Sequence, residues 1–246
     1  FENDLFGYNN LGAGYNYRIG DVYSYKGKSN LVSFYGRANY SFDGKYMFTG
    51  TVRRDGSSRF GANNKWGTFP SASAAWKITG EDFMQSTSNW LSNLKLRAGY
   101  GVTGNQEGIG EYKSLSILGV GQDSYYDPAT GKWSLAYSPT QNPNPDLKWE
   151  STKQLNIGLD FGLFNRINGS LEVYNKQTND LLYTYQVPQP PYLVGTMLAN
   201  VGEMSNKGIE LTLNADIITG KDFTWSANLT LAHNTQKIEH LSNQVY

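Results

Sequence analysis

Four basic residues form the densest group of charges in the chain that could bind a ligand. Arg53, Arg54, Arg59 and Lys65 follow one another closely in the sequence, and an anionic ligand or partner would neutralise them. Short groups of charges are more often simply solvated at a surface. The three arginines are therefore candidate contact residues, with a solvated surface as the alternative interpretation.

Aromatic rings and amides make up a second candidate contact group, in two stretches that carry no strand pattern. The rings are Tyr125, Tyr126, Trp133 and Tyr137 in the first stretch, and Tyr183, Tyr185 and Tyr192 in the second, where Gln186 and Gln189 accompany them. Sugar rings stack on aromatic faces and hydrogen-bond to amides, so these residues are typical of a glycan or peptide contact. Packing of the loops would use the same residue types.

Residues for catalysis, metal binding or cofactor binding do not occur in the patterns that those functions require. Cysteine is absent, and His233 and His240 belong to no His, Asp and Glu grouping with metal-ligand spacing. The glycine-rich segment 104–110 lacks the Lys-Ser/Thr of a phosphate loop, and no Gly-x-Ser-x-Gly elbow is present. Acidic residues lie on polar strand faces with no pocket pattern: Asp160, Glu172, Glu210 and Asp216. We expect no enzyme activity, no metal and no cofactor.

The overall composition narrows the class of protein. Lys and Arg together number 21, as do Asp and Glu, so no net charge points to nucleic acid as a partner. Hydrophobic residues make up 39% of the chain, and no window approaches the roughly 18 consecutive apolar residues of a helical membrane span. An aromatic content of 14% argues against a disordered chain.

Apolar and polar residues alternate with a period of two along eight segments, which is the pattern of β-strands. In one of them Leu94, Leu96 and Ala98 oppose Lys95 and Arg97. The segments cover residues 31–42, 45–54, 71–78, 94–103, 153–163, 166–176, 209–217 and 223–231. All but the third, which has eight residues, are roughly 9 to 12 residues long, as tilted membrane strands are, whereas soluble strands average about 5 to 6. The charged residues on the polar faces suit a water-filled lumen.

This pattern predicts an all-β fold in which the strands form the wall of an antiparallel transmembrane β-barrel. We expect six apolar side chains to face lipid: Phe48, Leu96, Leu159, Leu171, Leu211 and Leu229. Aromatic residues near the strand ends fit a girdle at the membrane interface, namely Tyr40, Phe42, Tyr46, Trp76, Trp90, Phe223 and Trp225. The high strand propensity of aromatic residues is the alternative explanation.

Connections between the segments alternate in length, as they do in outer-membrane barrels with short periplasmic turns and long extracellular loops. Short turns are expected at 43–44, 164–165 and 219–222, and long loops at 55–70, 104–149 and 178–206. The intermediate connection 79–92 is expected to hold a helical turn, because Glu81 and Asp82 are typical of a helix start. The expected division is an extracellular loop over 1–30, eight meandering strands over 31–235, and the start of the next loop over 236–246.

Four stretches of this sequence resemble the SusC/RagA family of TonB-linked outer-membrane importers. They are RRDGSSRFGANNKWGTFPSASAAWKI at 53–78, LKLRAGYGVTGNQ at 94–106, NPDLKWESTKQLNIGLD at 144–160 and NVGEMSNKGIEL at 200–211. The resemblance runs from about residue 31 to the end, and the combination and order of the motifs make it specific.

The resemblance implies a 22-stranded barrel in the outer membrane of a Gram-negative cell, of which about eight strands are present here. It also implies partners: outer-membrane lipids, a SusD-like lipoprotein, TonB acting through an N-terminal plug, and an oligosaccharide or peptide as the imported nutrient. No plug or TonB box occurs in these residues, so the chain is expected to be an internal fragment of the barrel.

Two other classes compete with this interpretation. One is a small self-contained eight-stranded barrel that serves as a porin or adhesin, and the other is a soluble β-sandwich that binds glycans. A sandwich tolerates charge on its outer strand faces, whereas a membrane barrel does not tolerate it on the face that meets lipid. The packing of the apolar face therefore discriminates between them.

Overall fold

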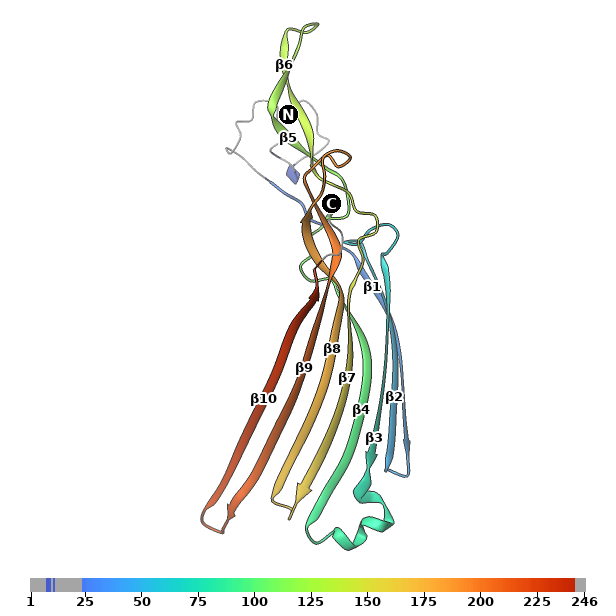
Figure 1. The fold of residues 1–246 in the computed structure, drawn as a ribbon, viewed down its shortest axis with the longest axis vertical. Helices are drawn as coiled ribbons and strands as arrows, with labels where there is room; N and C mark the ends of the chain where they lie inside the picture. The colour runs from blue at the N-terminus through green and yellow to red at the C-terminus, as the bar shows by residue number, and fades with distance from the viewer. Residues whose placement is uncertain (1–7, 10, 12–23, 242–246) are drawn as a thin grey trace.

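The computed structural model describes residues 8, 9, 11 and 24–241, which form one large antiparallel sheet and a separate hairpin beyond it (Figure 1). The sheet holds β1 (Leu31–Phe42), β2 (Tyr46–Ser57), β3 (Trp66–Lys77), β4 (Leu91–Asn105), β7 (Glu150–Leu163), β8 (Ile167–Gln186), β9 (Thr196–Thr219) and β10 (Thr224–His240), paired in that order. The hairpin is made of β5 (Ile117–Asp127) and β6 (Lys132–Gln141), so β4 pairs directly with β7.

The pairing register keeps apolar side chains on one face of all eight strands. Starting from β1, one row of cross-strand partners is Phe42, Tyr46, Trp76, Leu96, Leu159, Leu171, Leu211 and Leu231. The row one position away, on the opposite face, is Lys77, Lys95, Asp160, Ser170, Thr212 and Thr230. The six residues expected to face lipid all belong to the apolar face, called the outer face below. That lipid covers them stays a prediction.

The same row shows that the strands are tilted relative to the line of turns. Its member on β1, Phe42, is the last residue of that strand, whereas its member on β10, Leu231, is the seventh residue after Thr224. With about 3.3 Å per residue and about 4.8 Å per strand, this advance over seven strand steps corresponds to a tilt of roughly 35°. Closed membrane barrels have strands tilted by about this much.

Two turns at one end of the sheet have the positive φ angles of tight hairpin turns, at the positions that the sequence predicts. Asp43 and Gly44 have φ of 52° and 61°, and Phe164 and Asn165 have φ of 55° and 53°. Two consecutive residues with positive φ make the tight turn whose twist matches that of the flanking strands. The expected helical turn in 79–92 is also present, as the 3₁₀ helices η2 (Ile78–Gly80) and η3 (Asp82–Thr87).

A carboxylate fastens this helical connection to the strand ends. Glu81 Oε1 accepts hydrogen bonds from the Tyr46 hydroxyl at 2.6 Å and from Trp76 Nε1 at 2.9 Å. The two aromatic rings are stacked with centroids 6.4 Å apart. The hydrogen bonds from Tyr46 and then Trp76 lower the pKa of Glu81. Two residues of the expected aromatic girdle thus hold the connection in place.

Three of the connections are shorter in the structure than the sequence predicts. Strand β8 continues to Gln186 and β9 begins at Thr196, so the loop expected over 178–206 shrinks to 187–195. The loop expected over 55–70 shrinks to 58–65, and the strand region expected to end at 235 continues to His240. In these extensions polar and apolar residues no longer alternate with a period of two, although the backbone ladder continues.

The third long loop, expected over 104–149, contains the hairpin β5–β6, which the sequence interpretation missed. None of the hairpin residues whose exposure the structure describes is buried, so no apolar face requires a regular alternation of their polar and aromatic residues. In the loop expected over 1–30, residues 24–30 form no strand, and most of the remainder lies outside the described residues.

Both competing fold classes are wrong for the residues that the structure describes. A sandwich needs a second sheet on the first, whereas here the eight strands form a single layer and the only other sheet is the two-stranded hairpin. A small closed barrel needs β1 to pair with β10, whereas these two strands are the unpaired edges of the sheet. Across residues 24–241 no helix has the length and apolar character needed to cross a bilayer.

Candidate functional site

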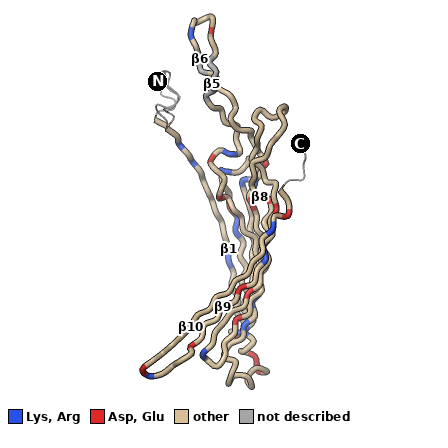
Figure 2. Tube along the Cα trace, turned by 60° about the vertical axis from the view of Figure 1, so that its left-hand side comes forward, with Lys and Arg blue, Asp and Glu red and all other residues tan. Residues whose placement is uncertain are grey.

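Residues of both signs follow one another along the middle of the strands (Figure 2), and the register places Lys95, Arg97, Asp160 and Glu172 on the inner face, which is the polar face of the sheet. Asp160 on β7 forms an ion pair with Lys95 on β4, with 2.8 Å between the carboxylate oxygen and Nζ. It also accepts hydrogen bonds from Arg97, at 3.0 Å from Nε and 2.9 Å from the terminal nitrogen. One carboxylate therefore binds two cations of the neighbouring strand.

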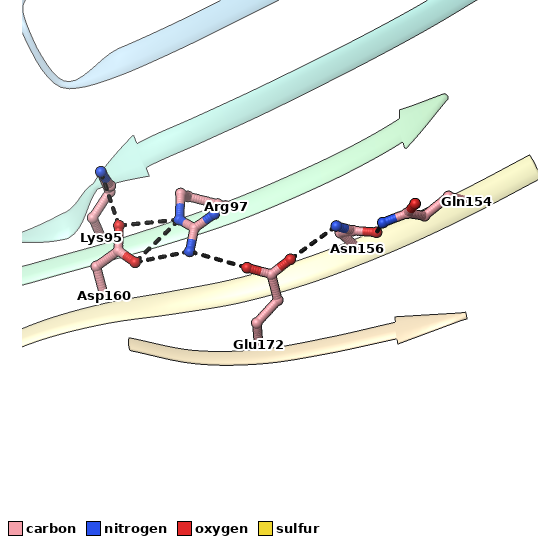
Figure 3. Close-up of polar contacts among 6 residues, drawn as sticks. All are labelled: Lys95, Arg97, Gln154, Asn156, Asp160 and Glu172. Atoms are coloured by element: carbon pink, nitrogen blue, oxygen red, sulfur yellow. Dashed lines mark hydrogen bonds and ion pairs between the residues drawn. The ribbon is translucent and has the colours of Figure 1, made fainter. Parts of the chain in front are cut away.

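The network continues onto β8 (Figure 3). Arg97 reaches Glu172 at 3.5 Å, and the other oxygen of Glu172 accepts a 2.8 Å hydrogen bond from Asn156. Asn156 in turn accepts a 2.6 Å hydrogen bond from Gln154. Six side chains thus connect β4, β7 and β8 on the inner face, as bonded neighbours rather than as isolated solvated charges.

A glycine makes the central contact of this network possible. In the register, Gly158 of β7 lies between Arg97 and Glu172. A Cβ atom at position 158 would lie 2.8 Å from a terminal nitrogen of Arg97 and 3.0 Å from its Cζ. The guanidinium therefore passes directly over the backbone of β7. The sequence interpretation did not identify this role of Gly158.

Chemically, the inner face offers a polar wall in which the charges at the centre are paired with one another. Among the described residues, Glu210 and Asp216 are exposed and have no ion-pair partner. The described part of the chain contains no group of three His, Asp or Glu residues that could hold a metal ion. The arrangement suits the contact of a wet lumen with a polar ligand or protein segment.

The loop end of the sheet carries a compact hydrophobic cluster, the only one among the described residues. It consists of Phe60, Phe69, Ile109, Leu147 and Trp149. The Trp149 ring lies 4.4 Å from the ring of Phe60 and 5.5 Å from that of Phe69, measured between centroids. The cluster joins three connections that are distant in the sequence.

Asparagine side chains attach segment 142–149 to the extended part of β9. The Asn142 amide donates to the carbonyl of Thr196 at 2.9 Å and accepts from the amide of Val194 at 3.1 Å. Asn144 donates to the carbonyl of Leu198 at 2.9 Å. Asn200 exchanges hydrogen bonds of 2.8 and 2.9 Å with the backbone of Lys148. We call segments 58–65, 106–116 and 142–149 together the loop platform.

The hairpin β5–β6 projects from this platform, away from the sheet (Figure 1). Tyr126 and Trp133 are cross-strand partners whose ring centroids lie 5.2 Å apart. Trp133 is 65% exposed, and Tyr125 and Tyr137 are also exposed. All four aromatic residues that the sequence proposed for this stretch therefore lie on a projecting arm with rings accessible to solvent.

Comparison with known proteins connects this architecture to one family. The family described as TonB dependent receptor-like, beta-barrel matches residues 1–244. The chain belongs to this receptor family. TonB-dependent receptor SusC of Bacteroides thetaiotaomicron is 43% identical over 214 residues, which are 86% of this chain and 21% of SusC. TonB-dependent receptor P3 of Formosa agariphila is 41% identical, over 89% of this chain and 21% of P3.

Solved structures of receptor barrels have the same fold. The RagAB peptide importer in the closed-closed state matches with a TM-score of 0.76 and 35% identity, covering 87% of this chain and 23% of that chain. The siderophore receptor PirA from Pseudomonas aeruginosa matches with a TM-score of 0.52 at 17% identity, which shows the fold alone. The receptor segment spans about a fifth of the length of its curated relatives. The resemblance to SusC and RagA and the prediction of a barrel wall are thereby confirmed, and receptor barrels of this family are outer-membrane proteins.

In this receptor segment the three candidate arginines do not form one cluster. Arg53 lies on the inner face and donates to Asp55 at 2.8 Å, whereas Arg54 lies on the outer face. Arg59, in the loop platform, pairs with Glu111 at 3.1 Å. Consecutive residues of a strand point to opposite faces of the sheet, so Arg53 and Arg54 lie on different faces although they are adjacent in the sequence. Their contact with a ligand or partner stays a prediction.

The other three tyrosines proposed as contacts do not share a loop. Tyr183 and Tyr185 belong to β8, where they pair with Ala199 and Met197, and Tyr192 lies half-buried in the connection to β9. Their role in binding also remains a prediction. The sequence interpretation missed the asparagines of the loop platform, although the NPDLKWE motif that it used for the family resemblance begins at Asn144.

Proposed function

We propose that this chain is a segment of the barrel wall of an outer-membrane receptor that imports an oligosaccharide or peptide by TonB-dependent transport. The observation that carries the proposal is the two-faced sheet on tilted strands, with a continuous apolar outer face and a polar inner face that carries an ion-pair network. In the proposal, outer-membrane lipids contact the outer face and the inner face lines the lumen. The loop platform and the hairpin then lie outside the cell.

The relatives support the nutrient class and the partner. SusC and the RagAB peptide importer are similar to this segment over most of its length. We infer a SusD-like lipoprotein as the surface partner. Contact with TonB would be made by a part of the receptor outside these residues. The proposal includes no cofactor and no nucleic acid.

Uptake by cells tests the import function. A strain lacking the gene that encodes these residues is compared with the parent strain for uptake of labelled oligosaccharides and labelled peptides. We expect uptake of one of the two classes to be lost, to return on complementation, and to be lost again when TonB is removed. Uptake that does not depend on TonB would overturn the proposal.

The hairpin aromatics permit a sharper test of where the nutrient or lipoprotein binds. We expect the double change Tyr126→Ala and Trp133→Ala in the full-length receptor to weaken one of two contacts about 30-fold or more, since exposed aromatic anchors contribute about 1 to 2 kcal/mol each. A raised half-saturation concentration for uptake would indicate the nutrient, and loss of the lipoprotein on co-purification would indicate the lipoprotein. Phe83→Ala is the matched control, because Phe83 is 66% exposed at the opposite end of the sheet. If both readouts stay unchanged, the hairpin contacts neither partner.

A further inference from the structure

Basic residues lie directly beyond the apolar part of the outer face. On three strands the run of apolar side chains ends in a cation at the next outer position: Arg54 follows Val52, Lys153 follows Leu155, and Lys207 follows Ile209. All three cations are exposed. Among the described strands, the first carboxylates on this face are Glu203 and Glu239, which lie farther from the turns.

These cations have no anionic neighbour to neutralise them within the described residues. In the register Lys153 lies beside Val102 and Gln177, and Lys207 lies beside Asn175 and Thr235. Arg54 is held 5.6 Å above the ring of Trp66. By contrast, Lys237, the next cation on β10, is paired with Glu239 at 2.6 Å.

Their height along the strands matches the edge of a membrane. Arg54 is the eighth residue after Tyr46, Lys153 the tenth before Leu163, and Lys207 the twelfth before Thr219. With a tilt of roughly 35°, each residue rises about 2.7 Å, so the cations lie roughly 22 to 32 Å from the turns. The apolar band of outer-membrane barrels is about 25 Å tall, so these heights correspond to lipid headgroups on the loop side.

A hollow of about 690 Å³ lies on the outer face below Arg54. It is lined mainly by small and apolar residues of β1, β2 and β3, among them Gly36, Ala38, Gly50, Val52 and Pro70. A Cβ atom added at Gly36 or Gly50 would meet nothing within 4 Å. The apolar lining of the hollow and its depth in the membrane therefore suit an acyl chain, and Arg54 lies next to it at the height of the headgroups.

We infer that the outer face holds a specific site for a phosphorylated glycolipid of the outer leaflet. An acyl chain occupies the hollow on β1–β3, and the headgroup phosphates meet Arg54 and Lys153, which lie three strands apart. Lys207 lies five strands from Arg54 and would meet a neighbouring lipid. The inference rests on the proposed place of the segment in the outer membrane, but not on import. A single lipid joins phosphate to acyl chain and so matches both features, whereas free phosphate matches only the cations. Each Lys or Arg near an anionic surface strengthens binding about fivefold.

Native mass spectrometry of the full-length receptor with bisphosphorylated lipid A tests the inference, and dephosphorylated lipid A is the reference probe. We expect Arg54→Gln and Lys153→Gln each to weaken binding of the bisphosphorylated form about fivefold, and Lys153→Arg to retain it. Gly50→Leu should weaken both forms, because it fills the hollow without removing a charge. Lys221→Gln, at the turn end, is the matched control and should bind as the unchanged receptor does.

Two outcomes would overturn the inference. One is equal binding of the two lipid A forms by the unchanged receptor at low salt. This comparison uses no variant, so it does not depend on whether a variant folds. The other is an equal loss of binding in Lys221→Gln and Arg54→Gln, which would indicate a general charge effect. Retained uptake in a variant that has lost lipid binding would separate this inference from the proposed import function.

Discussion

Placing an arginine at the centre of the outer face is the most direct test of the two-faced wall. Leu159 is the middle of five outward apolar residues on β7, from Leu155 to Leu163, and its cross-strand neighbours are Leu96 and Leu171. Four residues on either side, each rising about 2.7 Å, put it roughly 11 Å from both borders of the apolar band. Arginine at the bilayer midplane of a barrel costs about 2 to 4 kcal/mol, and we expect this loss for Leu159→Arg.

The matched control carries the same charge on the inner face. Thr212 of β9 lies between Ser170 and Thr230, at a position that the proposal exposes to the lumen. We expect Thr212→Arg to change stability by about 0.5 kcal/mol or less, because it meets water. Leu159→Ala separates the lost apolar contact from the introduced charge and should cost less than the arginine.

The assay is a urea titration of the full-length receptor in phospholipid vesicles, read by the retarded migration of folded barrels in unheated gels. We expect the unfolding midpoint of Leu159→Arg to fall well below that of Thr212→Arg. Equal midpoints for the two arginine variants would refute the assignment of the faces. A stability of Leu159→Arg equal to that of the unchanged receptor would refute contact with lipid at this position.

Three further changes test contacts seen in the structure. Gly158→Ala puts a methyl group against the Arg97 guanidinium and should cost about 1 to 2 kcal/mol in the same titration; no loss would mean that Arg97 does not cross β7. Asn142→Ala leaves buried backbone groups without partners, so we expect a loss of about 1 to 3 kcal/mol and faster proteolysis of the β8–β9 connection, and unaltered cleavage would contradict this. The pKa of Glu81 is lowered chiefly by the hydrogen bond from Tyr46, so its stabilisation is present above its unfolded-state pKa and is lost as pH falls through the folded value. The thermal midpoint of the unchanged receptor should therefore fall more steeply than that of Glu81→Gln below about pH 4.5, and parallel curves would count against this role.

The sequence by itself determined the two faces of the wall, the tight turns and the family. Side chains of a strand alternate by geometry, so the residues that share a face with Leu96 or Leu211 can be identified without knowing any partner strand. Asp43-Gly44 predicts its turn because these residue types tolerate positive φ. These features depend on residues that are close together in the sequence, so local sequence patterns predict them.

Tertiary structure alone decided how far the strands extend and which side chains meet. Beyond the apolar band the outer residues of β8 and β9 become polar, so the pattern ends at Val173 and Ile209 although the backbone ladder continues. The passage of Arg97 over Gly158 to Glu172 depends on the register of three strands, two of which are separated in sequence by a 44-residue connection. Register is set by the packing of whole faces and by turn geometry, and one residue of slip would move Arg97 to the lipid side. Contacts between residues so distant in the chain leave no period in the sequence, and only the folded sheet brings them together.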